Sequence, residues 1–183
     1  MRAVWIGVPE SFLEERHRLG QDKADELWEG VLHMVPPPAE VHSCVQTDLV
    51  VALSLLTRSR GWRVYVECGL FGAEKNYRVP DLILARPDHR STRGVEGAEL
   101  VVEVLSPDDE SRDKLPFYAR MGVREVWLIE PATRAFEILE LAGGAYRVVP
   151  AGADGTCSPL LGIELRVAEG ALELRDGDNI HVI

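Results

Sequence analysis

Three side chains in the middle of the chain could together hydrolyse a substrate with the help of a bound metal. Asp81 opens an apolar segment after Pro80, Glu103 lies inside the next apolar segment, and Lys114 follows it. Two carboxylates that face one point either share a proton, raise one another's pKa or bind a hard divalent cation. Mg²⁺ suits such a pair because it accepts one or two carboxylates and keeps water molecules that a substrate phosphate can replace. The lysine charge would then orient an attacking water or stabilise a developing phosphate charge.

Of the three, Glu103 has the strongest need for a charged partner, because apolar residues surround it in the sequence. Residues 100–105, LVVEVL, form a continuous apolar run that predicts a strand covered on both faces. An unpaired carboxylate there costs several kcal/mol, so Glu103 needs a cation or an arginine or lysine as its partner. Spacing alone also allows a simpler interpretation, in which a Glu103–Lys114 or an Asp81–arginine ion pair serves the fold only.

Hydrophobic periodicity predicts the elements that position these residues. Apolar side chains recur at helical spacing over residues 42–58, which therefore form the clearest helix. Lys114 lies in the first turn of another expected helix, and a shorter one is expected at residues 11–19. Residues 26–35 read as a hairpin that leaves Glu26, Glu29 and His33 in solvent.

The remaining segments predict strands, and a loop and a turn region between them. Strands are expected at residues 62–67, 77–85, 100–105 and 126–129, with a loop at 68–76, a polar surface turn region at 86–97, and hairpins at 134–149 and around 169–170. The order predicts an α/β or α+β fold in which one mixed sheet carries at least two helices.

Composition limits the class of protein. A chain of 183 residues suits a single domain, residues 1–183, with a sizeable core. No apolar run approaches the roughly 20 residues of a membrane helix, and the first residues lack a signal-peptide pattern, so we expect a cytoplasmic protein. The three cysteines follow no metal-ligand spacing and are expected to be small buried residues.

The charge distribution bears on nucleic-acid binding. The net charge of −10 argues against a general nucleic-acid coat, because such binding depends on lysine and arginine. Twelve of the twenty basic residues nevertheless fall within residues 58–124. Arg86, Arg90 and Arg112 are the predicted phosphate contacts, provided that the fold gathers them around the acids.

Four motifs in this order resemble those of a known family. They are YRVPD (77–81), ELVVEVLSP (99–107), DKLPFY (113–118) and GVREVWLIEP (122–131). Together with ELWEGVLHMVPPP (26–38) and the following His42, they resemble the Uma-two family, which comprises restriction endonuclease-like proteins of the PD-(D/E)XK nuclease superfamily. The resemblance covers most of residues 22–142 and implies a nuclease core, with helices flanking a central mixed sheet and hairpins at both ends.

The resemblance also implies a metal site. Asp81 and Glu103 would hold Mg²⁺ or Mn²⁺, with the backbone carbonyl of Val104 as a further ligand. The superfamily usually places a lysine two residues after the acid, where this chain has Leu105. In the Uma-two pattern the lysine moves to the following helix, and Lys114 matches that place.

Three other positions bear on the site, and two of them, His42 and Glu130, on the comparison with the family. His42 fits the pattern's histidine and would orient a ligand or water, although a helix-start cap explains it equally well. Gln46, one turn further along the same helix, is a second candidate for assisting the site. Glu130 stands where an aspartate is more usual.

The sequence therefore predicts a metal-dependent endonuclease that cleaves DNA phosphodiester bonds by water attack. The alternative is an inactive nuclease-fold protein that acts by binding or self-association, and a small-molecule hydrolase using the same site carries less weight. Superfamily nucleases often act as dimers, so the resemblance also implies a possible homodimer. A structure would distinguish the nuclease from the inactive binding protein, because the nuclease requires Asp81, Glu103 and Lys114 to converge in one open cleft.

Overall fold

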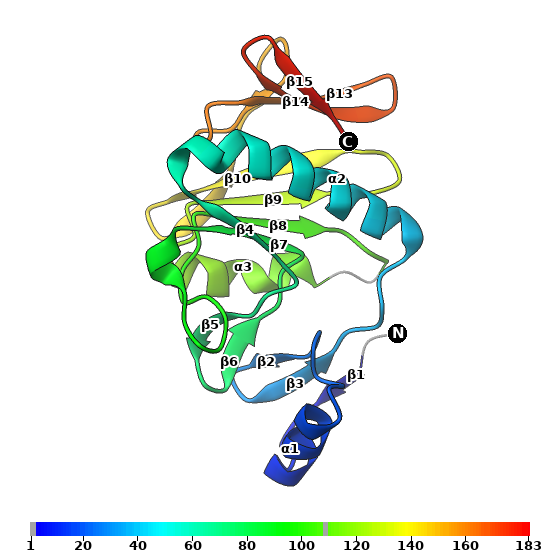
Figure 1. The fold of residues 1–183 in the computed structure, drawn as a ribbon, viewed down its shortest axis with the longest axis vertical. Coiled ribbons are helices and arrows are strands. Elements are labelled where there is room, and N and C mark those ends of the chain that lie inside the picture. The colour runs from blue at the N-terminus through cyan, green and yellow to red at the C-terminus, as the bar shows by residue number, and fades with distance from the viewer. Residues whose placement is uncertain (1–2, 108–109) are drawn as a thin grey trace.

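A computed structural model describes residues 3–107 and 110–183 of the chain (Figure 1). Its centre is a six-stranded sheet with the order β11-β10-β9-β8-β7-β4. Strands β8 and β9 are parallel and are connected through helix α3, whereas all other neighbours in this sheet are antiparallel. The elements are β4 (Arg63–Val66), β7 (Leu82–Ala85), β8 (Leu100–Val104), α3 (Ser111–Arg120), β9 (Glu125–Ile129), β10 (Phe136–Ala142) and β11 (Ala145–Val148).

Two helices cover opposite faces of this sheet. Every residue of β7, β8 and β9 is buried, as the continuous apolar runs predict. Helix α2 (Glu40–Thr57) packs Val45, Leu49 and Leu53 into the core on one face. Helix α3 contributes Phe117 and Tyr118 to a second core on the other face. Glu103 therefore lies on a central strand between two apolar layers.

Two smaller sheets flank the core. The N-terminal sheet, of order β1-β3-β2-β6-β5, lies on the α3 side, and the C-terminal sheet, of order β12-β13-β14-β15, lies on the α2 side (Figure 1). The remaining elements are β1 (Ala3–Trp5), α1 (Glu10–Arg18), β2 (Glu26–Trp28), β3 (Val31–Met34), η1 (Arg58–Arg60), β5 (Leu70–Ala73), β6 (Asn76–Arg78), η2 (Pro87–His89), β12 (Thr156–Cys157), β13 (Glu164–Ala168), β14 (Ala171–Asp176) and β15 (Asn179–Val182).

The structure confirms the predicted fold class, a mixed central sheet with flanking helices and terminal hairpins. The expectation of one sheet is wrong, because the described residues form three. The expected strand at 77–85 is two strands in different sheets, β6 and β7. Pro80 has no N–H to extend a ladder, so the chain leaves one sheet at Val79 and enters the next after Asp81. The expected loop at 68–76 contains β5, which pairs with β6.

The cysteines are not all buried, contrary to expectation. Cys44 and Cys157 are exposed and Cys68 is half-buried, and all three are free thiols. Cys44 lies on the outer face of α2, where helical periodicity places it away from the core. Among the described residues, no helix is long and apolar enough to cross a membrane.

Candidate catalytic centre

A cavity of about 390 Å³ lies where the ends of β7 and β8 meet the N-terminal sheet. Asp81 precedes β7, whereas Glu103 and Val104 end the antiparallel neighbour β8, so all three lie at the same edge of the central sheet. Lys114 reaches the cavity from α3. The fold thus brings the three residues predicted to carry the chemistry, and the predicted carbonyl ligand, to one cavity.

Asp81 is fixed by contacts on both its carboxylate and its backbone. The Val104 N–H donates to its Oδ2 at 2.6 Å, and the Nε2 atom of His42 lies 3.3 Å from its Oδ1. The Asp81 backbone carbonyl accepts from the Glu67 N–H at 3.1 Å and from the Gln46 side-chain amide at 3.2 Å. Gln46 therefore positions the strand entrance from α2 without touching the carboxylate.

His42 contacts one of the predicted metal ligands, Asp81. The hydrogen bond to the Asp81 carboxylate, and the charge of that carboxylate, raise the pKa of His42 although partial burial opposes the shift. The helix-start alternative for this residue is wrong, because Ala39 is the N-cap of α2 and no side chain caps the helix there. The other ring nitrogen, Nδ1, is buried and has no hydrogen-bond partner among the described residues.

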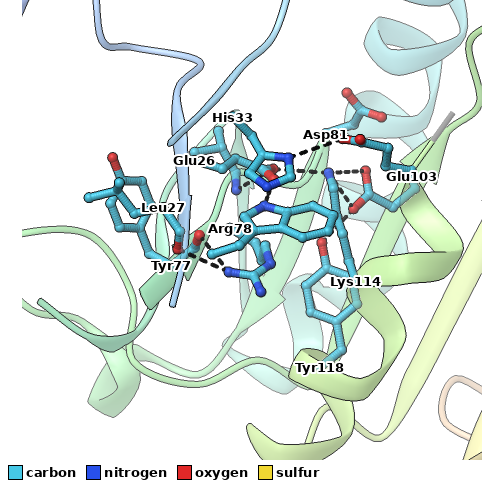
Figure 2. Close-up of polar contacts among 12 residues, drawn as sticks. Glu26, Leu27, His33, Tyr77, Arg78, Asp81, Glu103, Lys114 and Tyr118 are labelled. Atoms are coloured by element: carbon cyan, nitrogen blue, oxygen red, sulfur yellow. Dashed lines mark hydrogen bonds and ion pairs between the residues drawn. The ribbon is translucent and has the colours of Figure 1, made fainter. Parts of the chain in front are cut away.

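Lys114 lies between two buried carboxylates, as Figure 2 shows. Its Nζ is 3.1 Å from Glu103 Oε1 and 2.9 Å from Glu26 Oε1. The hydroxyl of Tyr118, one helical turn further along α3, also donates to Glu103. Glu103 and Lys114 are 3% and 4% exposed, so the prediction that Glu103 has a lysine partner is confirmed.

Burial and the neighbouring charges shift the pKa values of this group. Burial raises the pKa of Glu103 to about 7, although the Lys114 ammonium favours the ionised carboxylate. Burial alone would lower the pKa of Lys114, but the charges of Glu103 and Glu26 raise it above its ordinary value. The amine therefore stays charged at the bottom of the cavity. Burial and the charge of Glu103 also raise the pKa of Tyr118.

Sequence reasoning missed Glu26, which it placed in solvent. Glu26 is 1% exposed and accepts three donors: the Val79 N–H at 2.9 Å, the Trp28 indole N–H at 2.6 Å and the Lys114 ammonium. A hairpin pattern does not show which face of the hairpin another element covers, so no local sequence signal identifies Glu26 as a buried residue. Tyr118 could have been found, because a residue four positions after Lys114 shares its helix face.

An aromatic stack fixes the N-terminal sheet against α3. The Arg78 guanidinium lies 4.4 Å from the ring centroid of Trp28 and 4.4 Å from that of Phe117. The His33 ring also stacks on Trp28, with the two ring centroids 4.0 Å apart, and its Nδ1 lies 3.3 Å from Glu110 Oε2. The expectation that His33 is solvated is therefore wrong, because a helix from another part of the chain covers this face of the hairpin.

The three predicted phosphate-binding arginines do not gather around the acids. Arg86 pairs with Glu99 at 2.7 Å, at the end of β8 opposite to Glu103. Arg90 forms a backbone bridge with Val95 and does not line the cavity. Arg112, in the first turn of α3, does not line the cavity and pairs with Glu137 at 2.6 Å. The antiparallel course of β7 explains the position of Arg86, since this strand carries the chain from Asp81 to the opposite edge of the sheet.

We expect Glu26→Gln to destabilise the protein by about 1–3 kcal/mol. All three partners of Glu26 are donors, so the amide NH₂ of glutamine would face a donor and lack an acceptor. Urea denaturation would measure the loss in unfolding free energy. Glu29→Gln is the matched control in the same hairpin; Glu29 is exposed and contacts Arg120, so its change should stay within about 0.5 kcal/mol. Equal stability of the two variants would contradict the role of Glu26.

The chemistry of the donors fits a hard divalent cation. Among the described residues, no three histidine, cysteine, aspartate or glutamate side chains could hold a metal ion by themselves. Asp81, Glu103 and the Val104 carbonyl would instead offer only oxygen atoms, and Mg²⁺ accepts such partial sets because it keeps several waters.

The mixed sheet with a helix on each face matches the fold of a solved structure: "Crystal structure of a putative nuclease belonging to DUF820 from Anabaena variabilis ATCC 29413 at 1.96 A resolution". The TM-score is 0.60 at 21% sequence identity, and the match covers 75% of this chain and 82% of the other. This similarity establishes the fold.

The family follows from the sequence itself. The model of the Uma2 family, described as "Putative restriction endonuclease", matches residues 9–168. The chain therefore belongs to this family, which confirms the resemblance seen in its motifs. No curated protein matches the chain significantly.

Proposed function

We propose that this protein is a metal-dependent nuclease, acting as a single domain, that hydrolyses DNA phosphodiester bonds by water attack. The observation that carries the proposal is the convergence of Asp81, Glu103, Val104 and Lys114 on one cavity at one sheet edge. Membership of a family described as restriction endonucleases agrees with it.

Asp81, Glu103 and the Val104 carbonyl would hold Mg²⁺ or Mn²⁺. When bound, such an ion polarises a phosphate oxygen and lowers the pKa of a coordinated water. The protein's own contribution is to fix the ligands before substrate arrives. The Val104 N–H and His42 hold the Asp81 carboxylate, while Lys114 and Tyr118 hold that of Glu103.

Lys114 contributes a fixed positive charge beside the reacting phosphate. Its ammonium is held on two sides by Glu26 and Glu103, so it needs no reorganisation when negative charge develops on the phosphate. Because its pKa is raised, Lys114 does not act as a proton acceptor at neutral pH. Its role is to orient the attacking water and to stabilise the transition state by a charge-assisted hydrogen bond.

We expect the wild-type protein to bind Mn²⁺ and to nick supercoiled plasmid DNA, and Glu103→Gln to do neither. Calorimetric titration and gel electrophoresis measure the two properties. Glu140→Gln, which alters an exposed acid outside the cavity, is the control and should behave as wild type. A wild-type protein that binds no Mn²⁺ and leaves DNA intact with every divalent ion would refute the proposal.

The affinity for Mn²⁺ should rise with pH. A pKa of about 7 means that Glu103 is mostly protonated at pH 6 and ionised at pH 8 in the metal-free protein. The metal must displace that proton, so the dissociation constant should fall about tenfold from pH 6 to pH 8 and then level off. Titration at four pH values would measure this, together with the proton released. An affinity that is constant over this range would contradict the raised pKa.

One observation favours a second function, that of a binding module without catalysis. The net charge is −10, and Arg86 and Arg90 lie away from the cavity. Such a module would retain its fold but show no hydrolysis with any metal. The Mn²⁺ titration and the nicking assay together separate the two functions.

A further inference from the structure

The lining of the cavity is divided between a charged floor and an apolar rim. Glu103 and Lys114 form the floor and are almost fully buried. The rim consists of Pro36, Pro37 and Pro38 after β3, Val41 at the start of α2, and Pro107 after β8. The four prolines are exposed, and the Val41 side chain is 37% exposed. Any substrate that reaches the floor must therefore pass an apolar entrance.

The charges around the cavity do not suit a duplex backbone. Four of the lining residues are acidic, namely Glu26, Glu67, Asp81 and Glu103. The lining cations are Lys114, which two carboxylates already neutralise, and His42, which pairs with Asp81. Duplex binding depends mainly on lysine and arginine side chains that neutralise successive phosphates. The energy for holding a substrate here must come mainly from the metal site and from apolar contact.

The size and depth of the cavity also argue against a duplex substrate. Its volume of about 390 Å³ lies in the range of pockets that enclose a single small ligand. A duplex would have to unpair and unstack a nucleotide before that nucleotide could enter a pocket of this size, and this cost is least when the nucleotide is already single-stranded. An unpaired nucleotide can place its phosphate on the floor while its base lies against apolar side chains.

We propose that the cavity takes one unpaired nucleotide of single-stranded DNA, with the base against the apolar rim and the adjoining phosphate at the divalent cation that Asp81 and Glu103 would hold. This inference rests on the proposed nuclease function, whose substrate class it names. The proline rings supply rigid apolar faces at little cost in conformational entropy.

The test compares a labelled single-stranded oligonucleotide with the same sequence as a blunt duplex. Cleavage is measured with Mn²⁺, and binding is measured by fluorescence anisotropy with Ca²⁺. We expect the single strand to be cleaved and bound at least about tenfold better than the duplex. Pro37→Ser and Val41→Asn should each weaken single-strand binding about fivefold, because they remove apolar contact from the rim.

Two matched controls separate the rim from general effects of these substitutions. Val51→Asn changes another exposed valine of α2 that does not line the cavity, and Pro150→Ser changes an exposed proline in a distant loop. Both should bind the single strand as wild type does. Equal losses in Val41→Asn and Val51→Asn would overturn the assignment of the rim.

The outcomes also distinguish this inference from the proposed function. Cleavage of the duplex as fast as the single strand would overturn the inference and leave the nuclease function in place. Binding of the single strand without any cleavage would support the cavity's preference for unpaired nucleotides and refute the nuclease. Failure both to bind and to cleave either oligonucleotide would overturn the inference and the proposed function.

Discussion

Lys114→Met should destabilise the protein by about 3–5 kcal/mol and abolish its nuclease activity. The substitution leaves the carboxylates of Glu103 and Glu26 buried without the cation that lies within 3.1 Å of both. Removing one partner of a buried ion pair is costly because the remaining charge has lost both water and its counter-ion. Methionine has nearly the length of lysine, so loss of packing contributes little.

The penalty in Lys114→Met should depend on pH. Burial already raises the pKa of Glu103, and loss of the ammonium removes the main influence that lowers it. The folded state then binds a proton more readily than the unfolded chain, so stability falls as pH rises above the ordinary glutamate pKa. Urea denaturation at pH 5 and pH 8 should therefore show the larger loss at pH 8.

Lys75→Met is the control for this variant. Lys75 forms an exposed ion pair with Glu10 at 2.6 Å, so its loss should change the stability far less than the loss of Lys114 and should leave nicking unchanged. If Lys114→Met proves as stable and as active as Lys75→Met, then Lys114 serves neither the fold nor the reaction as described.

Asp81→Asn should lower the nicking rate on the order of a thousandfold while the fold stays intact. Asparagine keeps the shape of the side chain and can still accept the Val104 N–H, but it replaces an anionic ligand with a neutral one. The several kcal/mol that a bound metal contributes to the transition state correspond to about this change in rate. Single-turnover cleavage and Mn²⁺ titration would measure the two consequences.

The matched control for Asp81→Asn is Asp48→Asn, because Asp48 is an exposed aspartate on α2 outside the cavity. Its rate and Mn²⁺ affinity should equal those of wild type. If Asp81→Asn retains the wild-type rate, the metal does not use this carboxylate, and the convergence at the sheet edge would be structural only.

Much of the catalytic centre could be predicted from local sequence, because burying an unpaired carboxylate in an apolar strand costs free energy and therefore requires a partner. A glutamate in an apolar strand requires a partner, and Lys114 is the first lysine that the following helix presents to it. Continuous apolar runs likewise predicted β8 and β9, and helical periodicity predicted α2 to within two residues at its start. These features depend on residues close together in the chain, and the spacing of apolar residues there predicts the local structure.

The parts that could not be predicted depend on contacts between distant segments. Glu26 and Arg86 illustrate this in opposite directions. The hairpin pattern placed Glu26 in solvent, but α3 covers it. The count of arginines in the middle of the chain favoured Arg86 as a phosphate contact, but the course of β7 carries it to the far edge. The number of basic residues in a segment does not show where in the fold each side chain lies. A hairpin pattern likewise does not show which other element packs against the hairpin.

The short connection from β6 to β7 couples the packing of two sheets to the geometry of the centre. Val79 donates to Glu26 in the N-terminal sheet, and Asp81 begins the entry into the central sheet. A sliding or rotation of one sheet against the other would therefore change the separation of Glu26 from Asp81 and draw Lys114 away from Glu103. The rigidity of the interface between the two sheets, rather than that of either sheet alone, sets how precisely the metal ligands and the ammonium are held.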